Sequence, residues 1–132
     1  MSVIKVIHSE QAPKAVGAYS QAVVSGGVLY ASGQIGLDPQ KGTLVGDGVE
    51  SQAQQVTKNL TAVLAEAGAD LNDILKVNIF LVDMNDFPKV NAIYADWLGE
   101  HRPARATVAV AALPLGALVE MDVTARMLDS TA

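Results

Sequence analysis

The sequence predicts an α+β domain in which a single mixed β-sheet carries two helices packed on one face. Two long segments repeat apolar residues at helical spacing, and six shorter segments are rich in β-branched and apolar residues. Their order along the chain is β-β-β-α-β-α-β-β. No linker, repeat or low-complexity segment interrupts this pattern, so residues 1–132 are expected to form one domain.

Three strands are predicted before the first helix. The segment VIKVI (residues 3–7) is the first of them, and QAVVSGGVLYASGQI (residues 21–35) divides at Gly26-Gly27 into two more. A tight turn at these glycines makes the two strands a hairpin. The segment LDPQKGTLVGDG (residues 37–48) is predicted to be a loop because it is rich in turn-forming residues.

The two helices are predicted from their end signals and from their apolar stripes. Asp47 and Glu50 have the spacing of a capping box, and Gly68 ends the first helix. Asn85 or Asp86 is expected to cap the second helix. The stripe of the first helix consists of Ala53, Val56, Leu60, Val63, Leu64 and Ala67, and that of the second of Phe87, Val90, Tyr94, Trp97 and Leu98.

Three more strands complete the predicted sheet. ILKVNIFLVD (residues 74–83) is rich in β-branched and apolar residues, which is typical of a buried strand. ARATVAVAAL (residues 104–113) and ALVEMDVTARML (residues 117–128) are predicted to be neighbouring strands of a hairpin around PLG (residues 114–116).

The strand alternation raises a question about Arg105. Arg105 and Thr107 share one face of their strand, whereas Glu120 in the proposed hairpin partner faces Val110. In that register Arg105 lies well beyond salt-bridge distance from Glu120. An arginine keeps its charge, so it needs an acceptor from the protein or from a ligand. Either the register is not that of a simple hairpin, or both charges point into a shared cleft completed by other segments.

Composition excludes several classes of function. The chain has 9 Lys+Arg and 14 Asp+Glu, for a formal charge of −5, so no nucleic acid partner is expected. It contains no cysteine, and His8 and His101 are isolated, so no metal site and no other cofactor is expected. No segment resembles a signal peptide or a membrane span, which favours a soluble cytoplasmic protein. Only 17 % of the residues are charged, which favours an oligomer.

Five segments occur in order along the chain: GAYSQAV, YASGQIGLDP, IFLVDMNDFPKVNAIY, RPARATV and ALVEMDVTA. Together they resemble the Rid family, the reactive intermediate deaminases that are also called YjgF proteins, and the resemblance covers about Pro13 to Ala125. It implies a chorismate-mutase-like subunit and a homotrimer with clefts between neighbouring subunits. It also implies hydrolysis of 2-imino acids or their enamine tautomers, released by pyridoxal-phosphate enzymes, to 2-oxo acids and ammonia.

The resemblance further implies roles for individual residues. Arg105 would grip the substrate carboxylate, and Glu120 would place the attacking water. The same cleft would be lined by Tyr19, Ser32, Gly33, Asn91 and Thr107. The family often has cysteine where this chain has Thr107, so a thiol has no part in the expected reaction. That reaction needs orientation and one proton acceptor rather than a metal, because a protonated imine is already electrophilic.

Two alternatives to a deaminase stay open. One is an endoribonuclease or translation inhibitor, which the acidic composition disfavours. The other is a non-catalytic ligand sensor or chaperone that keeps the same cleft. The residue pattern taken alone also allows a structural ion pair at Arg105 and a solvent-facing Glu120.

Overall fold

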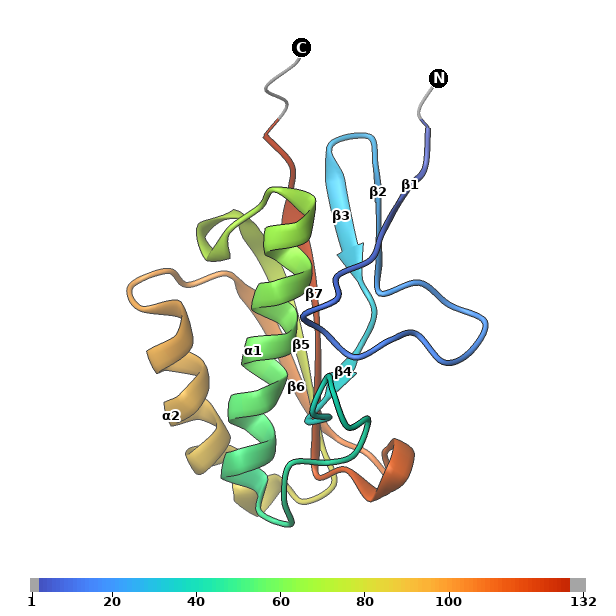
Figure 1. Cartoon of the computed structure of the whole chain (residues 1–132). Helices are drawn as coiled ribbons and strands as arrows, with labels where there is room; N and C mark the ends of the chain where they lie inside the picture. The colour runs from blue at the N-terminus through green and yellow to red at the C-terminus, as the bar shows by residue number, and fades with distance from the viewer. Residues whose placement is uncertain (1–2, 129–132) are drawn as a thin grey trace.

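The computed structural model describes residues 3–128, which form one curved sheet with both helices on the same face (Figure 1). The strand order is β1-β2-β3-β7-β5-β6, and the short β4 also pairs with β7. The strands are β1 (Lys5–Ile7), β2 (Ala22–Ser25), β3 (Val28–Ala31), β4 (Gln34–Ile35), β5 (Ile74–Leu81), β6 (Ala104–Ala109) and β7 (Val119–Arg126). The helices are α1 (Val49–Ala67) and α2 (Phe87–Leu98), with 3₁₀ turns η1 (Leu71–Asp73), η2 (Met84–Asp86) and η3 (Pro114–Gly116). The predicted α+β class is confirmed.

The helices follow their predicted stripes, but their N-terminal ends differ from the prediction. Gly48 precedes α1 in an extended conformation without a side-chain cap, so the predicted capping box of Asp47 and Glu50 is wrong. The helix begins at Val49, one residue too late for the Asp47 side chain to act as its cap. Asp86 precedes α2 as predicted, but the capping bond is made one turn earlier, where the Asp83 carboxylate accepts from Asn85 N at 2.9 Å. No helix within residues 3–128 is long and apolar enough to cross a bilayer.

The predicted hairpin between the last two strands is wrong. β6 pairs in parallel with β5, and β7 pairs antiparallel with the other edge of β5. A buried strand such as β5 needs hydrogen-bond partners on both edges, and β6 and β7 supply them. The PLG segment forms η3, where Leu115 and Gly116 both have positive φ angles, and carries the chain past the end of β5 rather than turning it back on β6.

The predicted second strand of the N-terminal hairpin is also divided. β3 ends at Ala31, and β4 resumes at Gln34, where it pairs with Met121 of β7. The break leaves Ser32 and Gly33 outside both strands. Both residues line a pocket next to Glu120 of β7.

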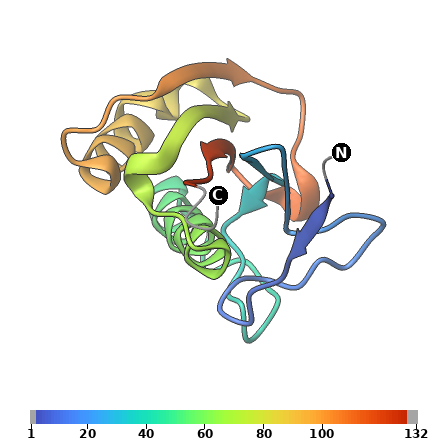
Figure 2. The same ribbon diagram turned by 90° about the horizontal axis from the view of Figure 1, so that it is seen from above.

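The two faces of the sheet have different surroundings. Val77, Ile79, Val119, Met121 and Val123 point toward the helices and are fully buried in the core. The opposite face is open, with Tyr30 at 53 % and Val108 at 46 % exposure. Seen from above, α1 and α2 lie on one side of the sheet, and the long β1–β2 loop (blue) extends at the edge away from α2 (Figure 2).

Register decides on which face each predicted charge lies. Arg105 is paired with Val77, and neighbouring residues of a ladder point to the same face, so Arg105 faces the helix side. Glu120 alternates with the buried Val119 and Met121 and lies on the open face. The two charges therefore lie on opposite faces of the sheet.

Candidate functional site

Four of the predicted site residues line one pocket of about 510 Å³, called here the Glu120 pocket. It lies between the β1–β2 loop, the β3–β4 break, η3 and β7. Its predicted members are Tyr19, Ser32, Gly33 and Glu120. Sequence reasoning did not find the rest of the lining, which consists of Pro13, Lys14, Val16, Gln34, Ile35, Leu37, Pro114 and Leu115.

The β3–β4 break contributes Ser32 and Gly33 to the lining of the Glu120 pocket. Ser32 Oγ donates a hydrogen bond to Ser20 O at 2.6 Å, and Ser32 N donates to Gln21 O at 2.9 Å. These bonds tie the break to the end of the β1–β2 loop. A Cβ atom on Gly33 would lie 2.3 Å from Glu120 Oε2, so only glycine leaves room for the carboxylate in this position.

Glu120 is a half-buried carboxylate with a raised proton affinity. Burial raises the pKa of Glu120, and the nearby Asp122 carboxylate raises it further. Asp122 itself accepts a hydrogen bond from Asn78 Nδ2 at 2.9 Å. Within residues 3–128 no side chain forms an ion pair with Glu120. Glu120 is thus suited to accept a proton from a bound water molecule.

Two other predicted residues line a second pocket of about 490 Å³, called here the Arg105 pocket. It lies between α2 and the segment leading into β6, and its lining consists of Asn91, Tyr94, Ala95, Arg102, Pro103 and Arg105. Arg105 Nη1 donates a hydrogen bond to Asn91 Oδ1 at 2.7 Å. The guanidinium carbon lies 5.2 Å from the ring centroid of Phe87 and 5.1 Å from that of Tyr94. These contacts orient the guanidinium through cation–π attraction and one hydrogen bond.

Arg105 has no carboxylate partner in the part of the chain that the structure describes. The ion pairs formed there join His8 to Glu10 and Arg126 to Asp73. The hydrogen bond to Asn91 uses one of the five N–H donors of the Arg105 guanidinium. The guanidinium is therefore oriented and still has donors with which to bind a carboxylate.

Two buried hydroxyl groups lie on the same side of the sheet as Arg105. Tyr94 OH and Thr107 Oγ1 have no hydrogen-bond partner within residues 3–128. The pKa of the Tyr94 hydroxyl is raised, because the effect of burial is larger than the opposing effect of the Arg105 and Arg102 charges. Thr107 lines neither pocket. Tyr94 could not be singled out from the sequence, because it belongs to the apolar stripe of α2.

A family model described as Endoribonuclease L-PSP matches residues 9–127, which is most of the chain. This family also carries the names Rid and YjgF. The chain belongs to the Rid family.

Relatives of this Rid protein carry more specific names. It is 47 % identical over 121 residues to a protein of Rattus norvegicus named 2-iminobutanoate/2-iminopropanoate deaminase, with 92 % of this chain and 88 % of that protein covered. The solved Rid family protein YyfA from Yersinia pestis matches with a TM-score of 0.93 at 48 % identity, covering 95 % of this chain and 100 % of that one. E. coli TdcF, solved with bound serine, matches with a TM-score of 0.89 at 36 % identity, covering 94 % and 99 %.

Within one chain of this Rid protein the predicted site is divided. Glu120 and its neighbours line one pocket, while Asn91 and Arg105 line the other. Six of the seven predicted residues thus form two groups with opposite charge, and Thr107 belongs to neither. One chain by itself does not bring Arg105 and Glu120 into a common cleft.

Proposed function

We propose that this protein hydrolyses 2-imino acids, or their enamine tautomers, to 2-oxo acids and ammonia. The observation that carries the proposal is the pair of unpartnered charges. Glu120 has a raised pKa and no ion-pair partner, and Arg105 is an oriented guanidinium without a carboxylate, both within residues 3–128. A 2-imino acid has a carboxylate that Arg105 can bind. Next to it lies an electrophilic carbon that a water molecule held by Glu120 can attack.

We further propose that each complete site is shared by two chains of a homotrimer. Arg105 and Glu120 lie on opposite faces of the sheet, so the Arg105 pocket of one chain would complete the Glu120 pocket of another. The exposed apolar residues support association. Val16 at the rim of the Glu120 pocket is 87 % exposed and Leu115 at the same rim is 70 % exposed. Such surface is typical of an interface between subunits.

In the proposed reaction, Arg105 holds the substrate carboxylate through two parallel hydrogen bonds. Water attacks C2 of the protonated imine while Glu120 accepts one of its protons, which gives an amino alcohol with an uncharged amino group and the original carboxylate. Glu120 then protonates the amino group. The C–N bond breaks as the hydroxyl proton returns to Glu120, and the products are the 2-oxo acid and ammonia. Glu120 finally releases its proton to solvent, and general-base assistance of this kind contributes a factor of about 10² to 10⁴.

The relatives support the class of ligand. A relative at 47 % identity is named a 2-iminobutanoate/2-iminopropanoate deaminase. The structural neighbour TdcF was solved with serine, a small molecule with a carboxylate next to an amino-bearing carbon. In the cell, the proposed activity would remove reactive intermediates released by pyridoxal-phosphate enzymes in the cytoplasm.

The activity can be tested with 2-iminopropanoate generated in situ from alanine by an amino acid oxidase. The protein is expected to accelerate the formation of pyruvate and ammonia beyond the rate of spontaneous hydrolysis. An unchanged rate with freshly folded protein would contradict the proposed reaction.

Mixing two inactive variants tests whether the site is shared. Chains with Glu120→Gln and chains with Arg105→Ala, refolded together, can form sites that combine an intact Arg105 with an intact Glu120. Random assembly in a cyclic trimer gives such sites at about one quarter of the interfaces. Activity in the mixture but in neither variant alone is expected. An inactive mixture, or a monomer by light scattering at micromolar concentration, would contradict the shared site.

The family description also names an endoribonuclease. The structure gives this activity little support, because within residues 3–128 His8 contacts Glu10 and His101 contacts Ile74 O, and neither histidine lines the Glu120 pocket. RNA cleavage by protein freed of trace nuclease, and lost in Glu120→Gln, would favour it. Binding of 2-oxo acids without any turnover would instead favour a ligand sensor or chaperone.

A further inference from the structure

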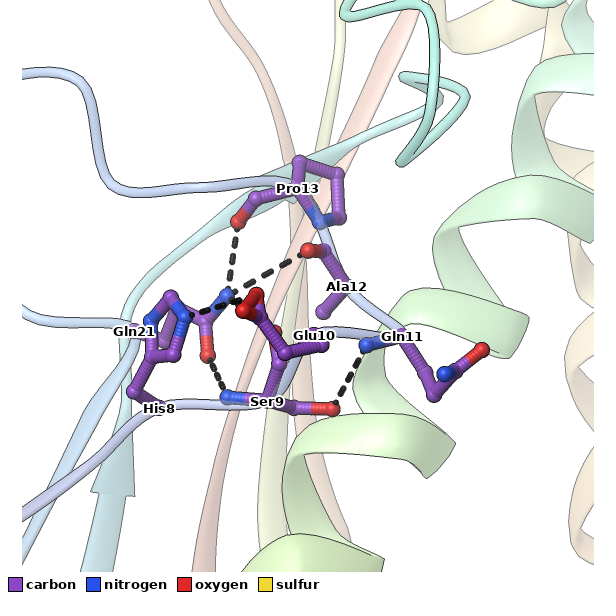
Figure 3. Close-up of polar contacts among 7 residues, drawn as sticks. All are labelled: His8, Ser9, Glu10, Gln11, Ala12, Pro13 and Gln21. Carbon is purple, nitrogen blue, oxygen red and sulfur yellow. Dashed lines mark hydrogen bonds and ion pairs between the residues drawn. The ribbon is translucent and has the colours of Figure 1, made fainter.

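A buried glutamine outside both pockets connects two segments that contribute to the Glu120 pocket, the turn of residues 9–13 and the β3–β4 break. Gln21 lies directly before β2, is 2 % exposed, and does not line the pocket itself. Its side chain points back across the β1–β2 loop toward the backbone of residues 9–13 (Figure 3).

The Gln21 carboxamide binds both ends of the turn formed by residues 9–13. Its Oε1 accepts from Ser9 N at 2.6 Å, and its Nε2 donates to Ser9 O at 3.1 Å and to Pro13 O at 2.8 Å. A longer bond of 3.5 Å reaches Ala12 O. Ser9, Ala12 and Pro13 are themselves buried, so little water is available to replace these bonds.

The main chain at Gln21 binds the β3–β4 break, which also lines the Glu120 pocket. Gln21 O accepts from Ser32 N at 2.9 Å, and the preceding Ser20 O accepts from Ser32 Oγ at 2.6 Å. Gln21 thus contacts Pro13 through its side chain and Ser32 through its backbone. Both of these residues line the Glu120 pocket.

The loop segment between these anchors depends on them. Lys14, Val16 and Tyr19 are exposed and line the Glu120 pocket. Among the backbone hydrogen bonds of residues 3–128, this segment contributes the bond from Tyr19 N to Gly17 O at 2.9 Å. A segment with so few internal bonds takes its position mainly from its two fixed ends.

We propose that Gln21 is a positioning residue for ligand binding in the Glu120 pocket. By fixing Pro13 and Ser32 at once, it sets the distance between the β1–β2 loop and the β3–β4 break, and so places Tyr19 against the ligand. The inference rests on the proposed function, because it assigns the ligand to this pocket. Glutamine suits the task because one planar group offers an acceptor to Ser9 N and donors to Ser9 O and Pro13 O.

The test compares Gln21→Met, which keeps the length of the side chain but makes no hydrogen bonds, with Gln21→Glu, which keeps only the acceptor when ionised. For Gln21→Met we expect KM for 2-iminopropanoate to rise on the order of ten-fold and kcat to change less than about two-fold, because Arg105 and Glu120 are untouched. For Gln21→Glu, whose ionised carboxylate would face the carbonyl oxygens of Ser9 and Pro13, KM is expected to rise at least as much. The Kd of pyruvate, a product-like 2-oxo acid, should rise with KM.

Trypsin provides a readout of the loop that does not depend on activity. Cleavage after the exposed Lys14 should become faster in the Gln21 variants relative to cleavage after Lys58 in α1, because the loop opens locally while the helix does not. Leu64→Ala is the matched control for loss of stability. Leu64 is buried in α1 and lines neither pocket, so this variant should melt earlier with an unchanged KM and with no rise in the ratio of cleavage after Lys14 to cleavage after Lys58.

Several outcomes would overturn the positioning role. In the first, the Gln21 variants melt earlier but keep the wild-type KM and the wild-type cleavage ratio. In the second, the cleavage ratio rises while KM and the pyruvate Kd stay unchanged. In the third, neither Gln21 variant folds. If the wild-type protein does not hydrolyse the imine, the proposed function fails on its own. The pyruvate Kd and the cleavage ratio then still decide whether Gln21 positions the pocket wall.

Discussion

The Glu120 pocket and the Arg105 pocket have similar volumes, about 510 and 490 Å³, but hold their charges in different ways. In the first, a carboxylate is half-buried between loop segments, and its pKa is raised by burial and by Asp122. In the second, a guanidinium lies over two aromatic rings of one helix and is bonded to Asn91. One pocket is assembled from four separate segments, and the other from α2 and the start of β6.

The difference shows why the two charges benefit from separation within one chain. A nearby arginine would lower the pKa of Glu120 and weaken it as a proton acceptor. A nearby glutamate would occupy the guanidinium fork that a substrate carboxylate needs. On opposite faces of the sheet, the two groups of one chain cannot form this pair, and in the proposed shared site the ligand would lie between Arg105 of one chain and Glu120 of another.

The largest expected effect is that of removing the proton acceptor. Glu120→Gln preserves the shape of the side chain but cannot accept a proton, so kcat should fall by about 10²- to 10⁴-fold. Binding of pyruvate should stay within a few-fold of wild type, because the carboxylate contact is made elsewhere. Single-turnover rates and calorimetric titration measure the two quantities. Wild-type turnover in this variant would remove Glu120 from the reaction.

The role of the Arg105 pocket is tested by replacing the planar guanidinium of Arg105 with the ammonium group of a lysine. Arg105→Lys cannot form two parallel bonds to a carboxylate, and a charged hydrogen bond contributes about 1.5 to 3 kcal/mol. We therefore expect kcat/KM to fall by about 10- to 150-fold, with weaker binding of 2-oxobutanoate.

Arg102→Lys is the matched control for this exchange. Arg102 lines the same pocket but donates to Gly99 O and His101 O, which an ammonium can also reach. It should keep near wild-type activity. If Arg105→Lys lowered the melting temperature while 2-oxo acid affinity per folded protein stayed constant, Arg105 would be a structural residue.

Gly33→Ala changes the Glu120 pocket without removing a functional group. The new Cβ atom would lie 2.3 Å from Glu120 Oε2, so the carboxylate must move by about an ångström. Because misplacement by 1 Å can cost about 100-fold in rate, kcat/KM should fall by about 10- to 100-fold. Gly48→Ala is the control, since its Cβ would meet only Ser51 Oγ at 3.8 Å. Equal activity of the two variants would show that the position of Glu120 does not limit the rate.

The smallest expected effect is a displacement of the pH profile in Asp122→Asn. The reaction needs Glu120 ionised, so activity is lost as the pH falls through the pKa of Glu120. Removing the Asp122 charge lowers this pKa, while burial, its larger cause, continues to raise it. The acidic limb of kcat/KM should therefore move partway toward lower pH. An acidic limb that stayed in place would show that Asp122 does not tune Glu120.

The helix α1 could be predicted from the sequence, whereas the strand pairing around the PLG segment could not. The stripe from Ala53 to Leu64 predicts α1 and its buried face correctly, because periodicity is a local property. The local turn signals of the PLG segment, in contrast, predict a hairpin between β6 and β7 that does not form. Whether β6 pairs with β7 or with β5 depends on residues far away in the chain, which local signals do not encode. Gln21, with its buried bonds to Ser9 and Pro13, carries no motif that would single it out.

The sequence by itself determined the α+β class, the two helices and the membership in the Rid family, because periodicity and ordered motifs are written along the chain. The motifs shared with the Rid family also pointed to Arg105 and Glu120 as candidate site residues. Only the tertiary structure decided that they lie on opposite faces of the sheet. The reason is that β5 pairs with β6 on one edge and with β7 on the other, and these pairings between distant segments fix the faces on which the two charges lie.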